Sequence, residues 1–245
     1  GPGICYRLWS EGQTGALPAF DTPEILSADL SGLVLDLASW GVTDPAALRF
    51  LDPPPRPAWT EAVTLLQQLD ALDGYGRITE EGRALARLPL HPRLAHMIHR
   101  AEDQGTAAEL AVLLTERGLG GDGTDLAHRL DRFRADRSRR ANDARTLARR
   151  WGGAPGDERD IGRLLARAYP DRVAQAAGAR GRYRLANGRA AALEETDALS
   201  REPFLVVTDV TGAAASGRIR AAAALARDDI EELFTANISS ETTLH

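Results

Sequence analysis

The segment Gln68–Met97, QLDALDGYGRITEEGRALARLPLHPRLAHM, decides how the rest of this chain is interpreted. It begins at the end of an apolar helix, turns at Asp73–Gly76 and continues through a short extended piece that ends at Thr79. Thr79 is a residue type that caps helices, and the two glutamates after it place negative charge in the first helical turn, where the helix dipole favours it. A helix, a tight turn, a short strand and a second helix form the pattern of a winged-helix core.

Prolines end this pattern and begin the next one. Pro89 ends the helix that starts after Thr79, and Pro92 stands in the first turn of a new helix, where its missing N–H costs nothing. We therefore predict a hinge between the winged helix and a helical bundle, formed by Pro89, Pro92 and Arg93.

Composition limits the class of protein. The chain has 245 residues, of which 43% are hydrophobic and 27% charged, so it is globular rather than disordered. No apolar run approaches the roughly 20 residues of a membrane span, no signal peptide is recognisable, and a single cysteine, Cys5, allows no disulfide framework. We expect a cytoplasmic protein without membrane contact.

Positive charge is concentrated in the middle of the chain. All 30 basic residues are Arg, whose planar guanidinium suits phosphates. The net charge is −9 over residues 1–125, +10 over 126–189 and −6 over 190–245. The basic middle block is therefore a candidate surface for a polyanion.

Outside the opening segment, the N-terminal third predicts one strand and several helices. Residues 1–9 resemble a short strand, which needs a partner, so we favour a chain that is a piece of a larger protein. A loop is expected at 11–20. The pattern of apolar residues, caps and prolines predicts helices at 22–40, 45–51 and 58–72.

The C-terminal half changes from helical to β-type sequence. Helices are predicted over 126–150 and over 157–177, and an interruption of the second helix at Pro170 is left open. A hairpin with an Asn187-Gly188 turn, followed by strands at 204–208 and 219–225, then predicts the first part of a small β-barrel. The chain ends before such a barrel could close, so we expect an incomplete one.

No pattern of catalytic residues is present. The sequence contains no Walker-type phosphate loop, nucleophile elbow or dinucleotide fingerprint. The glycine-rich stretch Leu119–Gly123 is not a phosphate-binding loop, because no Lys follows it and no strand precedes it. His91, His96 and His99 lie close together, but surface positions explain them better than a metal site does. We predict no catalytic residue and no metal ligand.

The basic block supplies the candidate binding residues. Its arginines fall on several faces of the predicted helix 126–150, and a second group surrounds Tyr183 on the predicted hairpin. Arginines beside an exposed aromatic ring on a small barrel are a common surface for single-stranded nucleic acid. An ordinary solvated helix face remains an equal alternative. The predicted nucleic-acid-binding residues are Arg134, Arg137, Arg139, Arg140, Arg182 and Arg184.

Several motifs together resemble one protein family. The sequence GPGxCYRL at residues 1–8 resembles the segment that follows the last conserved helicase motif in DEAH-box RNA helicases. TPEI at 22–25, FLDPP at 50–54 and LPLxPR at 88–93 are similar to further landmarks of that family, although Ser27 stands where the family usually has Arg. LSGLVLDLA at 30–38 and YRLANG at 183–188 resemble the bacterial HrpB-type branch.

This resemblance implies an architecture. The chain would be mainly α with a smaller β part: a winged helix plus a ratchet-like helical bundle, followed by a partial OB-like β-barrel. The implied modules are a terminal strand and linker of the second RecA-like motor domain (1–20), the winged helix (21–90), the ratchet-like bundle (91–178) and the start of the OB-like domain (179–245).

The resemblance also implies a function for a larger parent protein. The family's accessory domains form one side of an RNA channel and couple motor movement to translocation. The expected partners are single-stranded RNA, with DNA as an alternative, and the motor domains of the same parent chain. ATP and Mg are implied for that parent. No position here matches the family's ATPase residues, so we expect this fragment alone to bind no cofactor and to be inactive.

Two other functions remain open. A winged-helix DNA-binding regulator needs a basic recognition helix, but residues 58–72 contain no Arg and carry Glu61 and Asp70. A protein-interaction scaffold would instead pair the acidic and basic blocks within one parent chain. Arginines bound to internal carboxylates would favour that scaffold.

Overall fold

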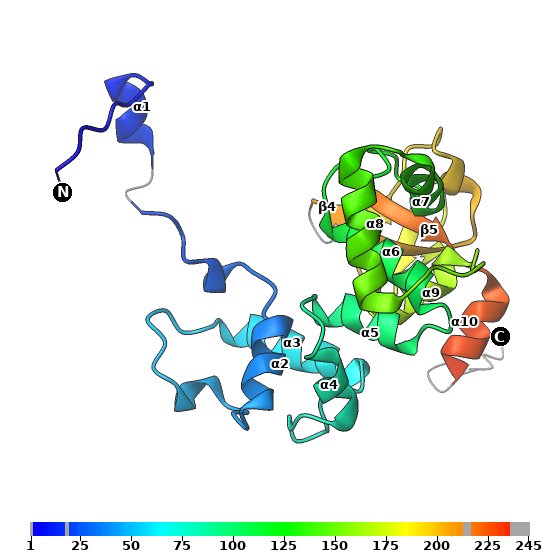
Figure 1. Cartoon of the computed structure of the whole chain (residues 1–245), viewed down its shortest axis with the longest axis horizontal. Coiled ribbons are helices and arrows are strands. Elements are labelled where there is room, and N and C mark those ends of the chain that lie inside the picture. Colours follow the sequence, from blue (N-terminus) through cyan, green and yellow to red (C-terminus); the bar gives the residue numbers. More distant parts are fainter. Residues whose placement is uncertain (1, 18–19, 213–216, 236–245) are drawn as a thin grey trace, which may run out of the picture. The chain divides into compact units, whose positions relative to one another are not determined.

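The computed structural model describes residues 2–17, 20–212 and 217–235. The chain forms two compact units, Gly1–Thr79 and Glu80–His245 (Figure 1). The sequence predicts four modules, and that finer division remains a prediction.

The first unit is built from short helices, whose bounds differ from those predicted. The predicted loop at 11–20 contains a helix that starts with a capping box of Ser10 and Gln13. The predicted helix at 22–40 begins late, because the Asp29 carboxylate accepts hydrogen bonds from the N–H and hydroxyl of Ser31. The elements are α1 (Glu11–Ala16), η1 (Glu24–Leu26), α2 (Ser31–Ser39), η2 (Pro45–Ala47) and α3 (Arg56–Gln68).

The strand predicted within residues 1–9 does not form in residues 2–9. A single strand needs a neighbouring strand to satisfy its N–H and C=O groups, and these residues have none here. The helix predicted at 45–51 is only the single turn η2, which the Asp44 side chain caps.

The core of the first unit lies between α2 and α3. The turn after α3 is fixed by one carboxylate: Asp73 accepts hydrogen bonds from the N–H groups of Tyr75 and Arg77 and from Nε of Arg77. A single β-bridge, Leu72 to Ile78, completes this short wing. The core side chains are Leu30, Val34, Leu35, Leu37, Leu65, Leu66 and Leu69.

The second unit begins with a helical bundle around α6. Residues Gly105–Leu113 of α6 are all buried, and α8 lies alongside it (Figure 1). Ala107, Ala108, Ala141 and Ala144 are among the buried residues of the two helices, so small side chains let them approach closely. The bundle helices are α4 (Glu80–Leu85), α5 (Pro92–Arg100), α6 (Gln104–Thr115), α7 (Leu126–Ala135), α8 (Arg139–Gly152) and α9 (Ile161–Ala168).

The prediction of one helix over 126–150 is wrong. The chain breaks after α7, where the Asp136 carboxylate accepts a hydrogen bond from the N–H of Ser138. Ser138 then caps α8 by accepting a hydrogen bond from the N–H of Ala141. Local side-chain caps therefore divide a sequence whose composition favours continuous helix.

The helix predicted over 157–177 forms only in the middle of that range, and the interruption left open at Pro170 is present. α9 ends at Ala168, and Pro170 opens the single turn η3 (Pro170–Arg172). The chain then enters a strand, β1 (Val173–Ala176), because proline interrupts the helix and the following residues pair with a distant strand.

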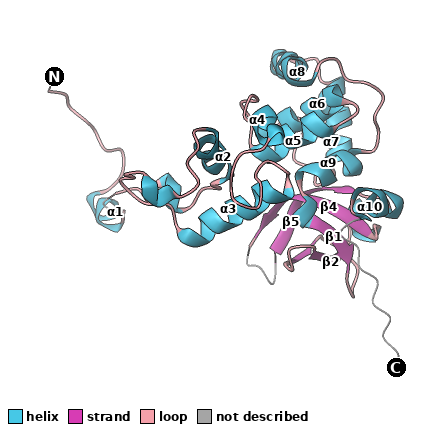
Figure 2. Cartoon of the chain, turned by 90° about the horizontal axis from the view of Figure 1, so that it is seen from below, coloured by secondary structure: helices cyan, strands magenta, loops and turns pink. Residues whose placement is uncertain are grey.

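The β part is a closed barrel, so the prediction of an incomplete one is wrong. The strand order is β1-β2-β3-β5-β4, and β1 pairs with β4 to close it. Figure 2 labels four of these strands, β1, β2, β4 and β5. All neighbours are antiparallel except β3 and β5. The remaining elements are β2 (Arg182–Leu185), β3 (Ala190–Ala192), η4 (Ala198–Arg201), β4 (Phe204–Thr211) and β5 (Gly217–Ala224).

Strand alternation decides which side chains of β2 face outward. Tyr183 and Leu185 point into the barrel, while Arg182 and Arg184 are exposed. The Tyr183 hydroxyl lies 2.7 Å from the Leu199 carbonyl oxygen and 2.9 Å from that of Glu202. The prediction of an exposed aromatic ring beside these arginines is therefore wrong, because Tyr183 is only 2% exposed.

The bundle and the barrel share one core within this unit. Val206, Ala221 and Ala223 pack with the buried residues of α9. A Cβ at Gly162 in α9 would lie 2.0 Å from the Ala224 carbonyl oxygen, so the helix backbone rests directly on β5. The last described helix, α10 (Arg227–Leu233), lies near α9 and is bound to it by Arg163 (Figure 2).

None of the helices in the described ranges combines the length and apolar character needed to cross a bilayer.

Candidate nucleic-acid interface

Four of the predicted binding residues meet at one turn. Arg134 lies in the last turn of α7, Arg137 in the break, and Arg139 and Arg140 at the start of α8. We call these four residues the α7–α8 corner. They belong to two helices rather than to one face of a single helix, and their side chains differ in what they contact.

Arg134 is used inside the protein. Its Nε lies 2.7 Å from Oε2 of Glu109, whose side chain is 5% exposed, and its Nη2 donates to the hydroxyl of Thr106 at 3.0 Å. This charge-assisted pair fastens α7 to α6. Little of this guanidinium remains available for a ligand.

The other three arginines of the corner face solvent. The Arg139 side chain is 96% exposed and 3.8 Å from Asp143. Arg140 hydrogen-bonds the carbonyl oxygen of Arg117 and lies 3.9 Å from Glu116. Surface pairs of this kind contribute at most about 1 kcal/mol, so a phosphate can replace them at small cost.

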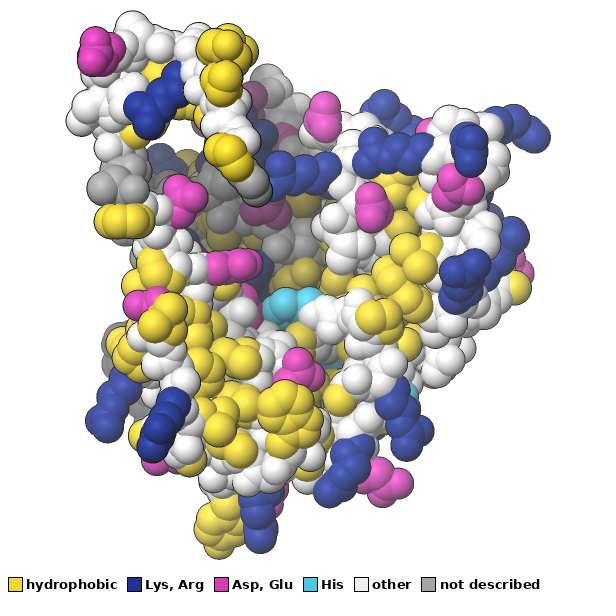
Figure 3. All heavy atoms as spheres, turned by 60° about the vertical axis from the view of Figure 1, so that its left-hand side comes forward, with side chains coloured by type: hydrophobic (Ala, Val, Ile, Leu, Met, Phe, Trp, Pro, Cys, Tyr) yellow, Lys and Arg dark blue, Asp and Glu magenta, His cyan; other side chains and the backbone are white. Residues whose placement is uncertain are grey.

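The exposed positive surface continues along α8. Arg149 and Arg150 are exposed in its last turn, about three helical turns from Arg139. Figure 3 shows one face of the molecule from which arginine side chains project into solvent. Arg145 is different, because it binds the carbonyl oxygens of Phe133 and Asp136 and holds the break together. Arg149 and Arg150 were missed although their helical spacing from Arg139 is visible in the sequence.

A second basic surface lies on the outside of the barrel. Arg182 pairs in register with Ala192 on β3, and Ala192 pairs with Arg218 on β5. Two arginines therefore flank an alanine on three adjacent strands, with Arg184 and Arg220 exposed beside them. We call Arg182, Arg184, Arg218 and Arg220 the barrel face. The alternation Arg218-Ile219-Arg220 was the signal that could have added the last two residues.

The three residues of the predicted hinge lie in different environments. Pro89 is exposed, whereas Pro92 is buried at the start of α5. Arg93 is buried and forms a bidentate ion pair with Asp171 at 2.5 and 3.2 Å. It also donates to the carbonyl oxygen of Ala168 at 3.1 Å. Arg93 thus fixes α5 to the segment between α9 and β1, and its role in a hinge stays a prediction.

An aromatic ring extends this contact into the barrel. Two guanidinium groups lie over the ring of Tyr169, Arg93 at 5.3 Å and Arg172 at 5.2 Å from the ring centre. Arg172 donates to the Thr208 carbonyl oxygen of β4 at 2.8 Å. Burial raises the pKa of Tyr169, while the two arginine charges lower it less. The stack links α5, the α9–β1 segment and β4.

No group of three His, Cys, Asp or Glu side chains among the described residues is arranged to hold a metal ion.

Comparison with known proteins finds relatives of this chain. A family model described as the winged-helix helicase-associated domain (HA2) matches residues 62–90. The chain is 38% identical over 237 residues to the ATP-dependent RNA helicase HrpB of Escherichia coli, covering 95% of this chain and 29% of that protein. This chain is homologous to the HrpB and HrpA DEAH-box RNA helicases.

Further relatives agree with this assignment. The crystal structure of the E. coli DExH-box NTPase HrpB superposes with a TM-score of 0.78 and 34% identity, over 93% of this chain and 28% of that one. The HrpA homologue of Haemophilus influenzae is 37% identical over 120 residues, or 46% of this chain and 9% of that protein. The chain thus spans less than a third of the relatives that it matches. The resemblance inferred from the motifs is confirmed, as is a mainly α fold with a winged helix and a small barrel.

Proposed function

We propose that this chain is the accessory region of an ATP-dependent RNA helicase and binds single-stranded nucleic acid through its exposed arginines. The main support for this proposal is homology to HrpB over 95% of the chain. The α7–α8 corner without Arg134, together with Arg182 and Arg184, supplies guanidinium groups that are open to phosphates. Contacts of this kind give binding that depends on salt and tolerates sequence changes.

The same region couples motor movement to the nucleic acid in this proposal. The support is the buried contact through Arg93, Tyr169 and Arg172, which links helices of the bundle to the barrel. Binding surfaces on the bundle and on the barrel then move together when a motor domain displaces either one. The motor domains would belong to the same parent chain.

ATP and Mg belong to the motor of the parent protein in this proposal. The present sequence contains no Walker-type loop to cradle a triphosphate. The purified chain is therefore expected to hydrolyse no ATP, with or without RNA. RNA-stimulated ATPase activity in a preparation free of other NTPases would contradict this expectation.

Salt-dependent RNA binding tests the proposed interface. Fluorescence anisotropy with a labelled single-stranded RNA gives the dissociation constant at several salt concentrations. Replacing Arg137, Arg139 and Arg140 by Gln should weaken binding and lower the slope of log K against log salt by about 2, since each phosphate contact contributes about 0.7.

A matched control separates a local site from net charge. Replacing the exposed Arg49, Arg56 and Arg227 by Gln removes the same charge elsewhere, and binding should change little. Equal losses in both triple variants would mean that only overall charge matters. Unchanged binding in the corner variant would exclude the corner and direct attention to Arg182 and Arg184.

A scaffold function is the second candidate. Arg134 with Glu109 and Arg163 with Asp229 are internal pairs, so part of the basic block serves the fold. A DNA-reading winged helix is less favoured, because α3 has no arginine after Arg56 and the matching family model is helicase-associated. A chain that binds no RNA at low salt would favour the scaffold.

A further inference from the structure

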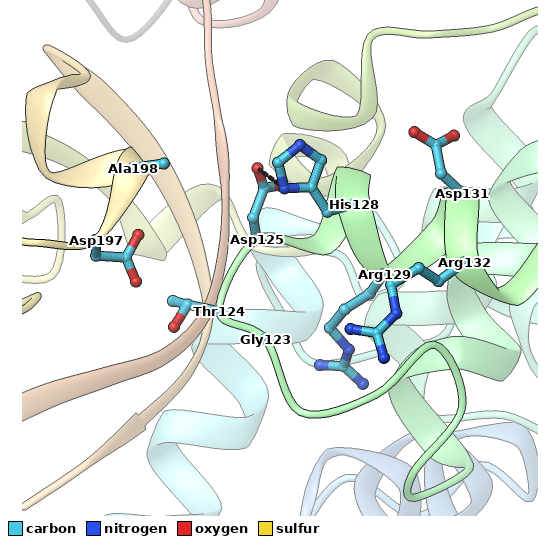
Figure 4. A pocket seen from close by; sticks show the side chains of 9 residues that line it. All are labelled: Gly123, Thr124, Asp125, His128, Arg129, Asp131, Arg132, Asp197 and Ala198. Carbon is cyan, nitrogen blue, oxygen red and sulfur yellow. Dashed lines mark ion pairs between the residues drawn. The ribbon is translucent and has the colours of Figure 1, made fainter.

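A groove of about 510 Å³ lies between the start of α7 and the turn η4 (Figure 4). It lies outside the α7–α8 corner and contains none of the residues predicted to bind nucleic acid. Arg129 and Arg132 line it from α7, which also contributes Asp131 and has Asp125 at its N-cap, and Asp197 lines it from the start of η4. The lining residues are Gly123, Thr124, Asp125, His128, Arg129, Asp131, Arg132, Asp197 and Ala198.

The glycine-rich loop shapes the basic end of this groove. Gly120 and Gly121 both have positive φ, +64° and +82°, which other residues rarely adopt. A Cβ at Gly120 would lie 2.1 Å from the carbonyl oxygen of Arg129, and one at Gly121 would lie 2.5 Å from Nη2 of Arg132. The bare loop backbone therefore lies directly against the two arginines.

Arg129 and Arg132 have no ion-pair partner among the described residues. The Nε of Arg129 is shielded from solvent and has no hydrogen-bond acceptor. Burial lowers the pKa of Arg129, and the more distant charges of Asp122 and Asp209 compensate only in part. A half-buried guanidinium without an acceptor is costly, and an anion at this end of the groove would satisfy it.

The opposite end offers oxygen acceptors. Asp197 uses Oδ1 to cap η4 through the N–H of Leu199, and its other oxygen is left to face the groove. Asp125 is occupied, because it caps α7 at Ala127 and lies 3.5 Å from His128 (dashed in Figure 4). A second groove shares Thr124 and Asp197 and reaches Arg218 of the barrel face. Together the two grooves connect the α7 arginines to that face.

We propose that this groove holds one nucleotide of single-stranded RNA, with its phosphate on Arg129 and Arg132 and its base at Asp197. A carboxylate only accepts hydrogen bonds. It therefore favours a base that presents an amino group beside a ring N–H, as guanine does, over uracil, whose single N–H lies between two carbonyl oxygens. This proposal rests on the proposed RNA binding and adds a preference for the base at one position.

Two RNAs that differ in one base test this preference. Anisotropy titrations would compare U9 with the same oligonucleotide carrying a central guanine. The intact chain should bind the guanine-containing RNA at least about fivefold more tightly. Asp197→Asn keeps an oxygen to cap η4 but adds an amino donor, so the preference should disappear while binding of U9 persists.

Arginine variants test the phosphate end. The Arg132 side chain is exposed, so the Arg132→Gln variant should fold normally. The double variant Arg129→Gln, Arg132→Gln should bind both RNAs more weakly. It should also lower the slope of log K against log salt by about 1. Thermal melting checks that each variant is folded. A chain that binds both RNAs equally, or a preference that survives Asp197→Asn, would overturn the groove inference.

The two proposals fail in different ways. No salt-dependent RNA binding at all would remove the proposed function together with the groove. RNA binding that responds to the corner variant, but not to the arginines of the groove, would leave the function in place and remove only this site.

Discussion

Arg93 and Arg139 carry the same charged group but use it in opposite ways. Arg93 lies where α5 contacts the segment between α9 and β1, which we call the α5–β1 junction, and Arg139 lies at the α7–α8 corner. The side chain of Arg93 is 8% exposed, and its Nη1 and Nη2 groups donate to Asp171 and the Ala168 carbonyl oxygen. The side chain of Arg139 is 96% exposed and approaches only Asp143, at 3.8 Å. A count of basic residues along the sequence therefore overstates the surface that a polyanion can reach.

The largest effect is expected at the junction. Arg93→Met leaves the Asp171 carboxylate with only Arg172, at 3.9 Å, and breaking a buried pair in this way costs about 3 kcal/mol. Urea unfolding of the second unit measures the loss. Arg139→Met should change the free energy of unfolding by less than about 0.5 kcal/mol. Similar losses in the two variants would mean that burial does not separate these regions.

A smaller loss of stability is expected at Arg134, which joins α7 to α6. Arg134→Met leaves Glu109, 5% exposed, without its charged partner and should cost about 2 kcal/mol. The double variant Arg134→Met, Glu109→Leu removes both charges and should recover much of that stability. No recovery would show that the packing of the arginine stem, rather than the ion pair, holds α7 to α6.

The barrel provides a third comparison, between neighbouring residues of one strand. Tyr183→Phe leaves the carbonyl oxygens of Leu199 and Glu202 without their shared donor, which should cost about 1–2 kcal/mol. Replacing Arg182 and Arg184 by Gln should leave the melting temperature nearly unchanged and weaken RNA binding. A drop in stability from the arginine variant would contradict the exposure of Arg182 and Arg184 on the barrel face.

The smallest effect concerns pH at α10. Hydrogen bonding and charge from Arg163 lower the pKa of Glu232 below its ordinary 4.5. Since the folded pKa is the lower one, this pair stabilises the fold above pH 4.5, and its contribution is lost as pH falls through the folded value. Burial raises the pKa of Asp160, helped by Asp229, so that group acts in the opposite sense.

NMR titration of the side-chain carboxyls measures both directions. Glu232 should titrate below 4.5 and Asp160 above 3.8, and Glu232→Gln should remove the acid-side loss of hydrogen-exchange protection in α10. An ordinary pKa for Glu232 would show that Arg163 does not hold α10 in solution.

Local signals in the sequence predicted the winged-helix segment and the start of α5. The Asp73 turn and Pro92 at the first helical position act within a few residues, so one sequence is enough to recognise them. β1 was missed because Val173–Ala176 carries little strand signal and its partner β4 lies about 30 residues away. The break between α7 and α8 was missed because its caps lie within a uniformly polar, arginine-rich stretch.

Sequence reasoning found exposed arginines but could not tell which ones the fold would bury. The pairing of Arg93 with Asp171 joins residues 78 positions apart, and Arg134 finds Glu109 25 positions away. Neither partner is recognisable from spacing along a helix or strand. The unpaired Arg129 and Arg132 were likewise invisible, because their environment depends on a loop that the sequence identified only as rich in glycine.

The direct seating of α9 on β5 at Gly162 has a consequence for volume. Helix backbone in contact with strand backbone leaves little void between the two layers. The volume lost when a protein unfolds scales with the internal voids that disappear. Hydrostatic pressure should therefore do little to separate α9 from β5. The backbone amides of these two elements are expected to be among the last in the second unit to undergo hydrogen exchange as pressure rises.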